Sequence, residues 1–369
     1  VELKPDASGI REGGIHQTII EDAGQIASGD IMLPAEGSHF FKINDTYYIF
    51  LITWPRNGIR TQLVYRSDNV TGPYEGRVAV SDRGIAQGEI FDTPDGDWYA
   101  MLFRDYGAVG RIPYLMPVRW EDGYPIFGKD GKVPDTLEIA AESRKMDGIV
   151  SSDEFERDMG DAALPLEWQW NHNPDSSHWS VTERPGYLTL TNARRVDSLE
   201  AARNTLTQRT FGPECAARVA MDVSDMKNGD VAGLAAFQHK YGFVGVRKSD
   251  DSTSVVMVNA GGAQPEVVAS IPFDQETIYL QTYMDYRNRT DKAYFSYSLD
   301  GTEWQSIGDT LQMEYTLFLH FMGYRFALFN YATENPGGSV YFDYFRVYES
   351  DSIPANASKE SPGTQIDHD

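Results

Sequence analysis

The sequence predicts an all-β protein in which propeller blades are followed by a β-sandwich. Two stretches, residues 41–50 and 91–101, share one pattern: an aromatic residue, a turn with Asn or Asp, and then two aromatic residues in a row. They lie roughly 50 residues apart, which is close to the length of a propeller repeat. The chain also contains 33 glycines and 18 prolines, and few stretches have helical periodicity. This composition is typical of short strands joined by turns.

The propeller part is expected to cover residues 1–128. Residues 65–68 and 71–74 predict a further strand and turn between the two repeats, and the region closes near residues 120–128. Residues 129–151 are polar and charged without a strand pattern, so they are expected to form a linker.

The pattern of the sequence changes from residue 152. Short strands joined by Asn-Gly, Asp-Gly and Gly-Gly turns are typical of a β-sandwich of the jelly-roll or concanavalin-like kind, expected over residues 152–349. The strands are expected at residues 187–190, 217–223, 242–246, 254–258, 292–297 and 339–345. Residues 350–369 are expected to be a disordered tail.

Charge and composition exclude several classes of partner. The formal net charge of −23 makes nucleic acid and anionic membranes poor partners, whereas a neutral polysaccharide or a cation suits an acidic surface. The alternative is that the acidity serves solubility alone. One cysteine excludes an intrachain disulfide, and no apolar run is long enough to span a bilayer. The first residues, from Val1 on, do not have the pattern of a leader; a secreted location is expected, and the oligomeric state is left open.

Glu36 lies in a setting that suits acid catalysis. It stands in Ala35-Glu36-Gly37 at the end of an apolar approach, before an alternating strand. A carboxyl group held among apolar groups has its pKa raised, which allows proton donation near neutrality. Glu36 is therefore the candidate general acid.

The same residues carry a family resemblance. Glu36-Gly37-Ser38-His39, followed by Lys42 and two tyrosines, resembles the general-acid blade of glycoside hydrolase family 43, where the motif is usually Glu-Gly-Pro-His. Residues 110–125 resemble the end of the last blade. Residues from 152 on, especially 168–174 and 342–345, resemble the C-terminal concanavalin-like sandwich of β-xylosidases in that family. The resemblance extends to about residue 348.

The resemblance implies a five-bladed propeller that inverts the anomeric centre with three acids. Glu36 matches the acid, but no residue upstream matches the base or the pKa-modulating Asp, since Asp6, Asp22 and Asp30 lie in turn-like contexts. Inverting hydrolysis needs an acid and a base roughly 6.5–9.5 Å apart. The expectation is thus that the first blades and the base are missing from this chain, which would be a piece of a longer enzyme; the alternative is a truncated relative without activity.

Four further residues are expected at the substrate site. Trp54 is expected to stack on a sugar ring, although a core tryptophan between blades is the alternative. Arg111 matches an arginine that contacts the sugar. Gln87 stands where many relatives carry a histidine near a central calcium or water cluster, and it is expected to line the site. Phe243, in the aromatic stretch 237–243, is expected to reach the mouth of the active site, with an ordinary edge-strand pair as the alternative.

The sandwich carries a candidate calcium site. Asp153, Glu154 and Asp343 offer the oxygen ligands that calcium prefers. The alternative is that these acids are simply solvated. No organic cofactor is expected.

The function expected is that of an exo-acting glycoside hydrolase that removes xylose, arabinofuranose, or both from xylo-oligosaccharides or arabinoxylan. The rival is a carbohydrate-binding protein without turnover, in which the sandwich is the binding module. The missing acids are the feature that separates the two.

Overall fold

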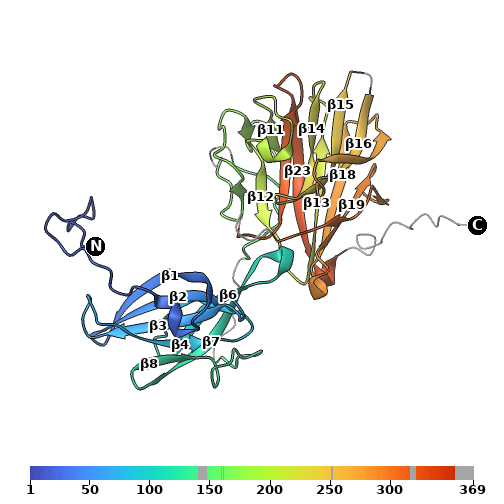
Figure 1. Ribbon diagram of the computed structural model, residues 1–369. Coiled ribbons are helices and arrows are strands. Elements are labelled where there is room, and N and C mark those ends of the chain that lie inside the picture. Colours follow the sequence, from blue (N-terminus) through green and yellow to red (C-terminus); the bar gives the residue numbers. More distant parts are fainter. Residues whose placement is uncertain (140–147, 159, 161, 251, 316–320, 354–369) are drawn as a thin grey trace, which may run out of the picture. The chain divides into compact units, whose positions relative to one another are not determined.

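The computed structural model describes residues 1–139, 148–158, 160, 162–250, 252–315 and 321–353 (Figure 1). It divides into two compact units: unit 1 comprises Val1–Asp105 and Arg111–Ser143, and unit 2 comprises Tyr106–Gly110 and Arg144–Asp369. Most of the predicted tail and residues 140–147 of the predicted linker lie outside the described residues. In the part that is described, no helix is long and apolar enough to cross a membrane.

Unit 1 consists of two antiparallel sheets, each with four strands in sequence order. Such a four-stranded meander is the form of a propeller blade. The predicted repeats are the hairpins β1–β2 and β5–β6, one in each blade. The first sheet contains β1 (Ile31–Ile43), β2 (Thr46–Pro55), β3 (Thr61–Ser67) and β4 (Glu75–Val80), and the second contains β5 (Ala86–Asp92), β6 (Trp98–Asp105), β7 (Arg111–Glu121) and β8 (Tyr124–Phe127).

An apolar core joins the two blades, and it extends into the predicted linker. Phe50, Ile90 and Phe127 are almost fully buried in it, and Val133 belongs to the same cluster. The Val133 N–H donates to Asp82 Oδ2 at 3.0 Å. Residues 129–135 therefore pack within unit 1, and the expectation of a linker beginning at residue 129 is corrected: the buried Val133 and its backbone hydrogen bonds hold this segment to the connection between β4 and β5.

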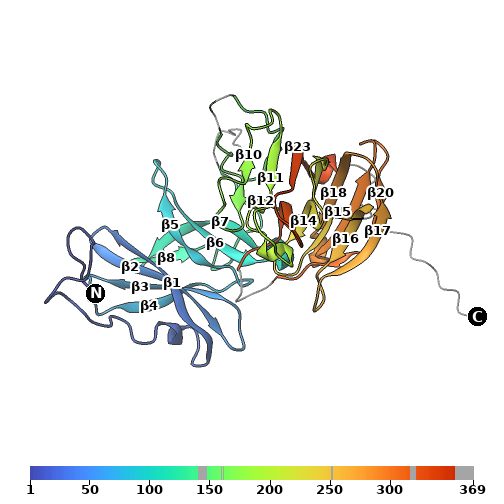
Figure 2. The ribbon, with the colours of Figure 1, turned by 90° about the horizontal axis from the view of Figure 1, so that it is seen from above.

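Unit 2 is a sandwich of two antiparallel sheets (Figures 1 and 2). The eight-stranded sheet contains β10 (Trp179–Ser180), β11 (Leu188–Thr191), β13 (Glu214–Asp222), β18 (Thr277–Asp285), β19 (Lys292–Ser298), β20 (Gln305–Ser306), β21 (Leu311–Gln312) and β23 (Ser339–Glu349). The seven-stranded sheet contains β9 (Gln169–Trp170), β12 (Leu206–Arg209), β14 (Asp230–Phe237), β15 (Gly242–Ser249), β16 (Ser252–Asn259), β17 (Glu266–Pro272) and β22 (Arg325–Ala332). All six strands predicted for this region are confirmed.

The central strands of the seven-stranded sheet, β14 and β22, are buried on both faces. Side chains alternate along a strand, so Phe326 and Leu328 of β22 enter the core of the sandwich. Phe329 and Tyr331 enter a second apolar cluster on the other face, to which Leu199 also belongs. These two strands consequently lack the inside-outside alternation that would reveal their orientation from sequence.

Cys215, on β13, can report on the integrity of this core. It is fully buried, and burial raises the pKa of its thiol to about 12. Because the thiolate is the reactive form, we expect an aromatic disulfide reagent to leave Cys215 unlabelled at pH 8 until the sandwich opens. In concentrated urea it should react fully. Prompt labelling of the folded chain, measured by the release of the chromophore, would contradict the packing described here.

Candidate active site

Glu36 lies on an irregular stretch of β1. The pairing of β1 with β2 places Glu36 opposite Ile52, and the register shifts on both sides of Glu36, between Leu33 and Glu36 and again between Glu36 and His39. Gly37 has a left-handed backbone with φ of +62°. Bulges of this kind re-aim side chains next to active sites. The Glu36 side chain is exposed, in contrast to the apolar surroundings expected from sequence.

Gln87 brings the second blade against this stretch. It sits in a register shift of β5, between Ala86 and Gly88, and its own φ is +64°. A left-handed backbone is uncommon for a residue other than glycine. Its N–H donates to Gln62 Oε1 at 2.6 Å, and its side-chain amide fills the space that a Cβ on Gly37 would need. Gln87 thus lies next to Gly37, the neighbour of Glu36, and its role in lining the site stays a prediction.

A histidine and a carboxylate form a second link between the blades. His39 Nδ1 lies 3.0 Å from Glu89 Oε2, and both side chains are partly exposed. His39 follows Glu36 on β1, and Glu89 follows Gln87 on β5. Two successive contacts between β1 and β5 thus fix the backbone that carries Glu36.

Asp105, at the end of β6, contacts two arginines. One of its oxygens contacts Arg60, and the other lies 3.3 Å from Arg111 Nε. The side chains of Asp105 and Arg60 are 16% and 11% exposed, so solvent screens this pair weakly. The Arg60 guanidinium lies 5.1 Å from the ring centroid of Trp54, and that of Arg111 lies 4.3 Å from the ring of Phe103.

This network unites two of the predicted site residues and adds two that were missed. Trp54 and Arg111 are linked through Arg60 and Asp105, so one face of the Trp54 ring is occupied by a cation. Sequence reasoning missed the linking pair because Arg60 is in the β2–β3 hairpin and Asp105 is in the other blade. Only the pairing of blades brings them together, and neither stands in a motif.

Comparison with known proteins decides the family. The family described as the β-xylosidase C-terminal concanavalin A-like domain of GH43 matches residues 152–348, just over half of the chain. The chain belongs to glycoside hydrolase family 43.

Solved structures and curated relatives agree with this assignment. A bifunctional GH43-CE protein of Bacteroides eggerthii is 55% identical, with a TM-score of 0.90 over 94% of this chain and 44% of that one. A GH43 glycoside hydrolase engineered to display endo-xylanase and exo-arabinofuranosidase activity is 29% identical, with a TM-score of 0.79 over 94% of this chain and 69% of that one.

Two curated proteins are similar over most of the chain. A putative β-xylosidase of Xylanibacter ruminicola is 33% identical over 80% of this chain and 55% of its own length. A β-xylosidase of Formosa agariphila is 30% identical over 87% of this chain and 60% of its own length. The family 43 chain described here thus spans a little more than half the length of these relatives.

The structure corrects the role expected for Phe243. This residue is on β15 and is fully buried, where it packs edge-on against Phe329 with the ring centroids 4.8 Å apart. A side chain held in the second apolar cluster of the sheet is not available to a substrate. The alternative, an edge-strand pair, is not observed either, because β15 lies between β14 and β16 inside the sheet.

The acids expected to bind calcium have other partners. Asp153 is buried and accepts hydrogen bonds from Arg157 Nη2 at 2.6 Å, Trp168 Nε1 at 2.9 Å and the Phe155 N–H at 2.8 Å. Asp343 is exposed on β23. The described residues contain no group of three or more His, Cys, Asp or Glu placed to hold a metal, so the predicted calcium site gains no support in this part of the chain.

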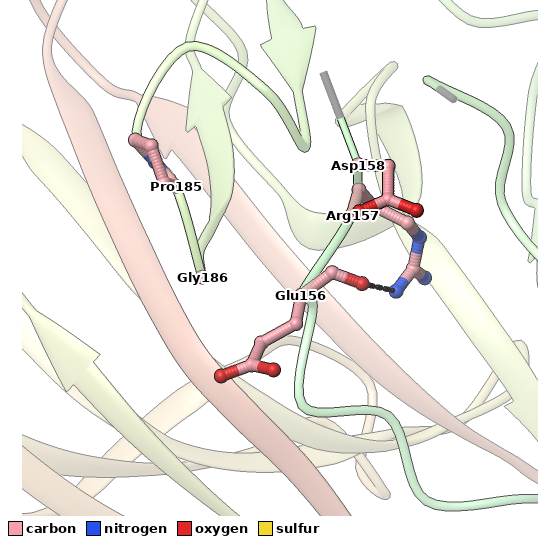
Figure 3. Close-up of a pocket in the computed structure, with 5 residues that line it drawn as sticks. All are labelled: Glu156, Arg157, Asp158, Pro185 and Gly186. Atoms are coloured by element: carbon pink, nitrogen blue, oxygen red, sulfur yellow. Dashed lines mark hydrogen bonds between the residues drawn. The ribbon is translucent and has the colours of Figure 1, made fainter. Parts of the chain in front are cut away.

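Arg157 also lines an open cavity of about 510 Å³ with Glu156, Asp158, Pro185 and Gly186 (Figure 3). Figure 3 shows its Nη1 donating to the Glu156 backbone oxygen, at 2.8 Å. The charge of this guanidinium is matched by Asp153, and the described residues that line the cavity form no group of three or more acids, histidines or cysteines placed to hold a metal.

Replacement of Asp153 by Asn should destabilise unit 2 by about 3–5 kcal/mol at pH 7, the usual cost of breaking a buried ion pair. Burial alone would raise the pKa of Asp153, but the hydrogen bonds from Arg157, Trp168 and Phe155 hold it below its ordinary value. The stabilisation is therefore present above pH of about 4 and is lost as the pH falls through the folded-state value. Urea unfolding across this range measures it.

The matched control is Glu154→Gln, which removes the exposed pair of Glu154 with Arg346. It should cost no more than about 1 kcal/mol. Equal losses in the two variants at pH 7 would contradict the special role of Asp153.

Replacement of Gly37 by Ala should lower the free energy of unfolding by more than the cost of a left-handed backbone alone, because the new methyl group collides with the Gln87 amide. The backbone term is about 1–2 kcal/mol. Gly96→Ala, at an exposed turn with φ of +88° and open space around its Cβ, measures that term by itself. Adding Gln87→Ala to Gly37→Ala should recover the excess, as followed by urea unfolding. Strictly additive losses would show that the blades do not touch here.

Proposed function

We propose that this chain is the part of an inverting glycoside hydrolase that carries the general acid, Glu36. The enzyme removes xylose, arabinofuranose, or both from the ends of xylan-derived oligosaccharides. The observation that carries the proposal is the position of Glu36: an exposed carboxyl group on a bulged strand, within the Glu-Gly-x-His motif, and fixed by a neighbouring blade. The names of the relatives support the substrate class.

The chemistry assigned to Glu36 is protonation of the glycosidic oxygen as the bond to the anomeric carbon breaks. The leaving sugar alcohol is a poor leaving group unless it receives a proton. Water attacks the anomeric carbon from the opposite face and gives its proton to a base, so the product has the inverted configuration. We assign no residue of this chain as that base.

Arg111 and Trp54 form the wall that binds the sugar in this proposal. Asp105 holds the Nε edge of Arg111, which sets the direction of its guanidinium toward sugar hydroxyls. A planar guanidinium fixed by a carboxylate loses little conformational freedom when it binds a hydroxyl pair. Gln87 supplies an amide beside the acid and can both donate and accept a hydrogen bond.

Replacement of Glu36 by Gln in the gene product that contains this chain tests the role of the acid. Hydrolysis of xylobiose should fall by about 10²–10⁴-fold, the usual worth of general-acid assistance. Hydrolysis of a dinitrophenyl xyloside should change little, because its leaving group needs no proton. The ratio of kcat/KM for the two substrates is the measurement.

Glu89→Gln is the control, because Glu89 is an exposed carboxylate on the adjacent strand, paired with His39. It should affect the two substrates to the same small extent. An equal loss on both substrates in Glu36→Gln, or a loss in Glu89→Gln that depends on the leaving group, would overturn the assignment. Absence of turnover in the unaltered protein would favour the binding-only rival.

A further inference from the structure

A cavity of about 320 Å³ opens in unit 2 at one end of the seven-stranded sheet. Phe237, the last residue of β14, pairs with Arg325, the first residue of β22, and both line the cavity together with Met322 and His239. Phe237 belongs to the apolar cluster on the face of the sheet that is turned away from the sandwich core. The cavity therefore belongs to that face, where Phe237 supplies an apolar wall.

Arg325 is a buried cation whose hydrogen-bond partners in the described part of the chain are neutral. It is 9% exposed. Its Nη1 donates to Thr207 Oγ1 at 3.1 Å, its Nη2 donates to Asn171 Oδ1 at 2.8 Å, and its guanidinium lies 5.6 Å from the ring centroid of Phe237. These partners are neutral, so they orient the guanidinium and leave its charge uncompensated. Burial lowers the pKa of Arg325, and the charge of Arg209 adds to the effect.

Arg209 repeats the positive charge on the next strand. The antiparallel register of β12 and β22 places Arg209 directly opposite Arg325, and paired residues point to the same face of a sheet. Like charges in directly opposite positions destabilise a sheet. Arg209 and the buried Arg325 repel each other across the two strands. An anion bound between them would reduce this repulsion and would also pair with the charge of Arg325.

The other titratable groups at the cavity are largely satisfied by one another. The Glu200 carboxylate lies 2.9 Å from His239 Nδ1, and the Glu200 backbone oxygen lies 2.7 Å from His172 Nε2. Among the described residues that line the cavity, Glu200 is the one acid and its carboxylate is hydrogen-bonded to an imidazole, whereas the hydrogen bonds of the Arg325 guanidinium go to a hydroxyl and an amide.

We propose that this cavity binds the carboxylate of a sugar acid, with a hexuronic acid unit of a decorated xylan chain as the ligand. The guanidinium of Arg325 would receive the carboxylate, Arg209 would add a second cation at the rim, and the C–H face of the pyranose ring would pack on Phe237. A volume of about 320 Å³ is at the lower limit for ligand pockets and suits one sugar unit. The inference rests on the proposed function only for the source of the sugar acid.

The test compares two oligosaccharides of equal length, glucuronosyl-xylotriose and xylotetraose, on the full chain by titration calorimetry. The acidic sugar should bind at least about 10-fold more tightly, because a hydrogen bond to a charged group contributes roughly 1.5–3 kcal/mol. Arg209→Gln changes an exposed side chain, so the variant should fold. It should weaken binding of the acidic sugar about 3–10-fold and leave the neutral one unaffected.

Arg195→Gln is the matched control. Arg195 forms a bridge with Ala332, the last residue of β22, and Arg325 is its first residue. The two sites are thus separated by roughly 20 Å of strand, well beyond the screening length. The control should bind as the parent does.

Arg325→Met should abolish the preference for the acidic sugar, and its circular dichroism spectrum reports whether it folds. If it does not fold, the comparison of Arg209→Gln with Arg195→Gln decides alone. Equal affinity for both sugars, equal weakening in the Arg209 and Arg195 variants, or no binding at millimolar concentrations would each overturn the proposal. Because binding needs no turnover, a loss of hydrolysis in Glu36→Gln with unchanged binding would separate this site from the active site.

Discussion

The arrangement of the candidate active site depends on the close approach of Gly37 and Gln87. Two strands from different blades each contain a bulge at the same level, and each bulge has a residue with positive φ. A side chain on residue 37 would occupy the space of the Gln87 amide, so only glycine allows the blades to meet. Glu36 takes its direction from that contact. The Gly in the Glu-Gly-x-His motif is thus required by packing between blades as much as by local turn geometry.

Electrostatics organise the rest of this region around one carboxylate. Asp105 lies between Arg60 and Arg111, and each guanidinium rests on an aromatic ring. Contacts with an arginine on each oxygen hold this carboxylate in place. The same contacts restrict the flexible side chains of the two arginines. A preorganised pair of cations, each packed on an aromatic ring, follows from this arrangement.

The sequence was sufficient for the fold and insufficient for the contacts between distant strands, and its assignment of Glu36 as the acid stays a prediction. Repeated aromatic hairpins and frequent turns predicted both kinds of sheet, because these signals are local. The pairing of Arg60 with Asp105 depends on how two blades pack, and no local pattern encodes it. Phe243 was misassigned for a related reason: residues 242–246 of β15 are all buried, so they carry no pattern that distinguishes a core position from an exposed loop. Val133 was missed because a single valine among polar residues gives no periodicity.

Because β22 is buried on both faces, a charged side chain on it needs a physical explanation. On an exposed face an arginine is solvated, and its neighbours need no explanation. On β22 every residue is buried, so the solvation that Arg325 loses must be replaced, and Thr207 and Asn171 replace it only with neutral dipoles. Asp153 illustrates the opposite solution in the same unit, since its buried carboxylate has a guanidinium at 2.6 Å. Asp153 thus has a charged partner, whereas the hydrogen bonds of Arg325 go to neutral groups. Because the fold does not need such a cation at this position, the contrast favours a binding role for Arg325.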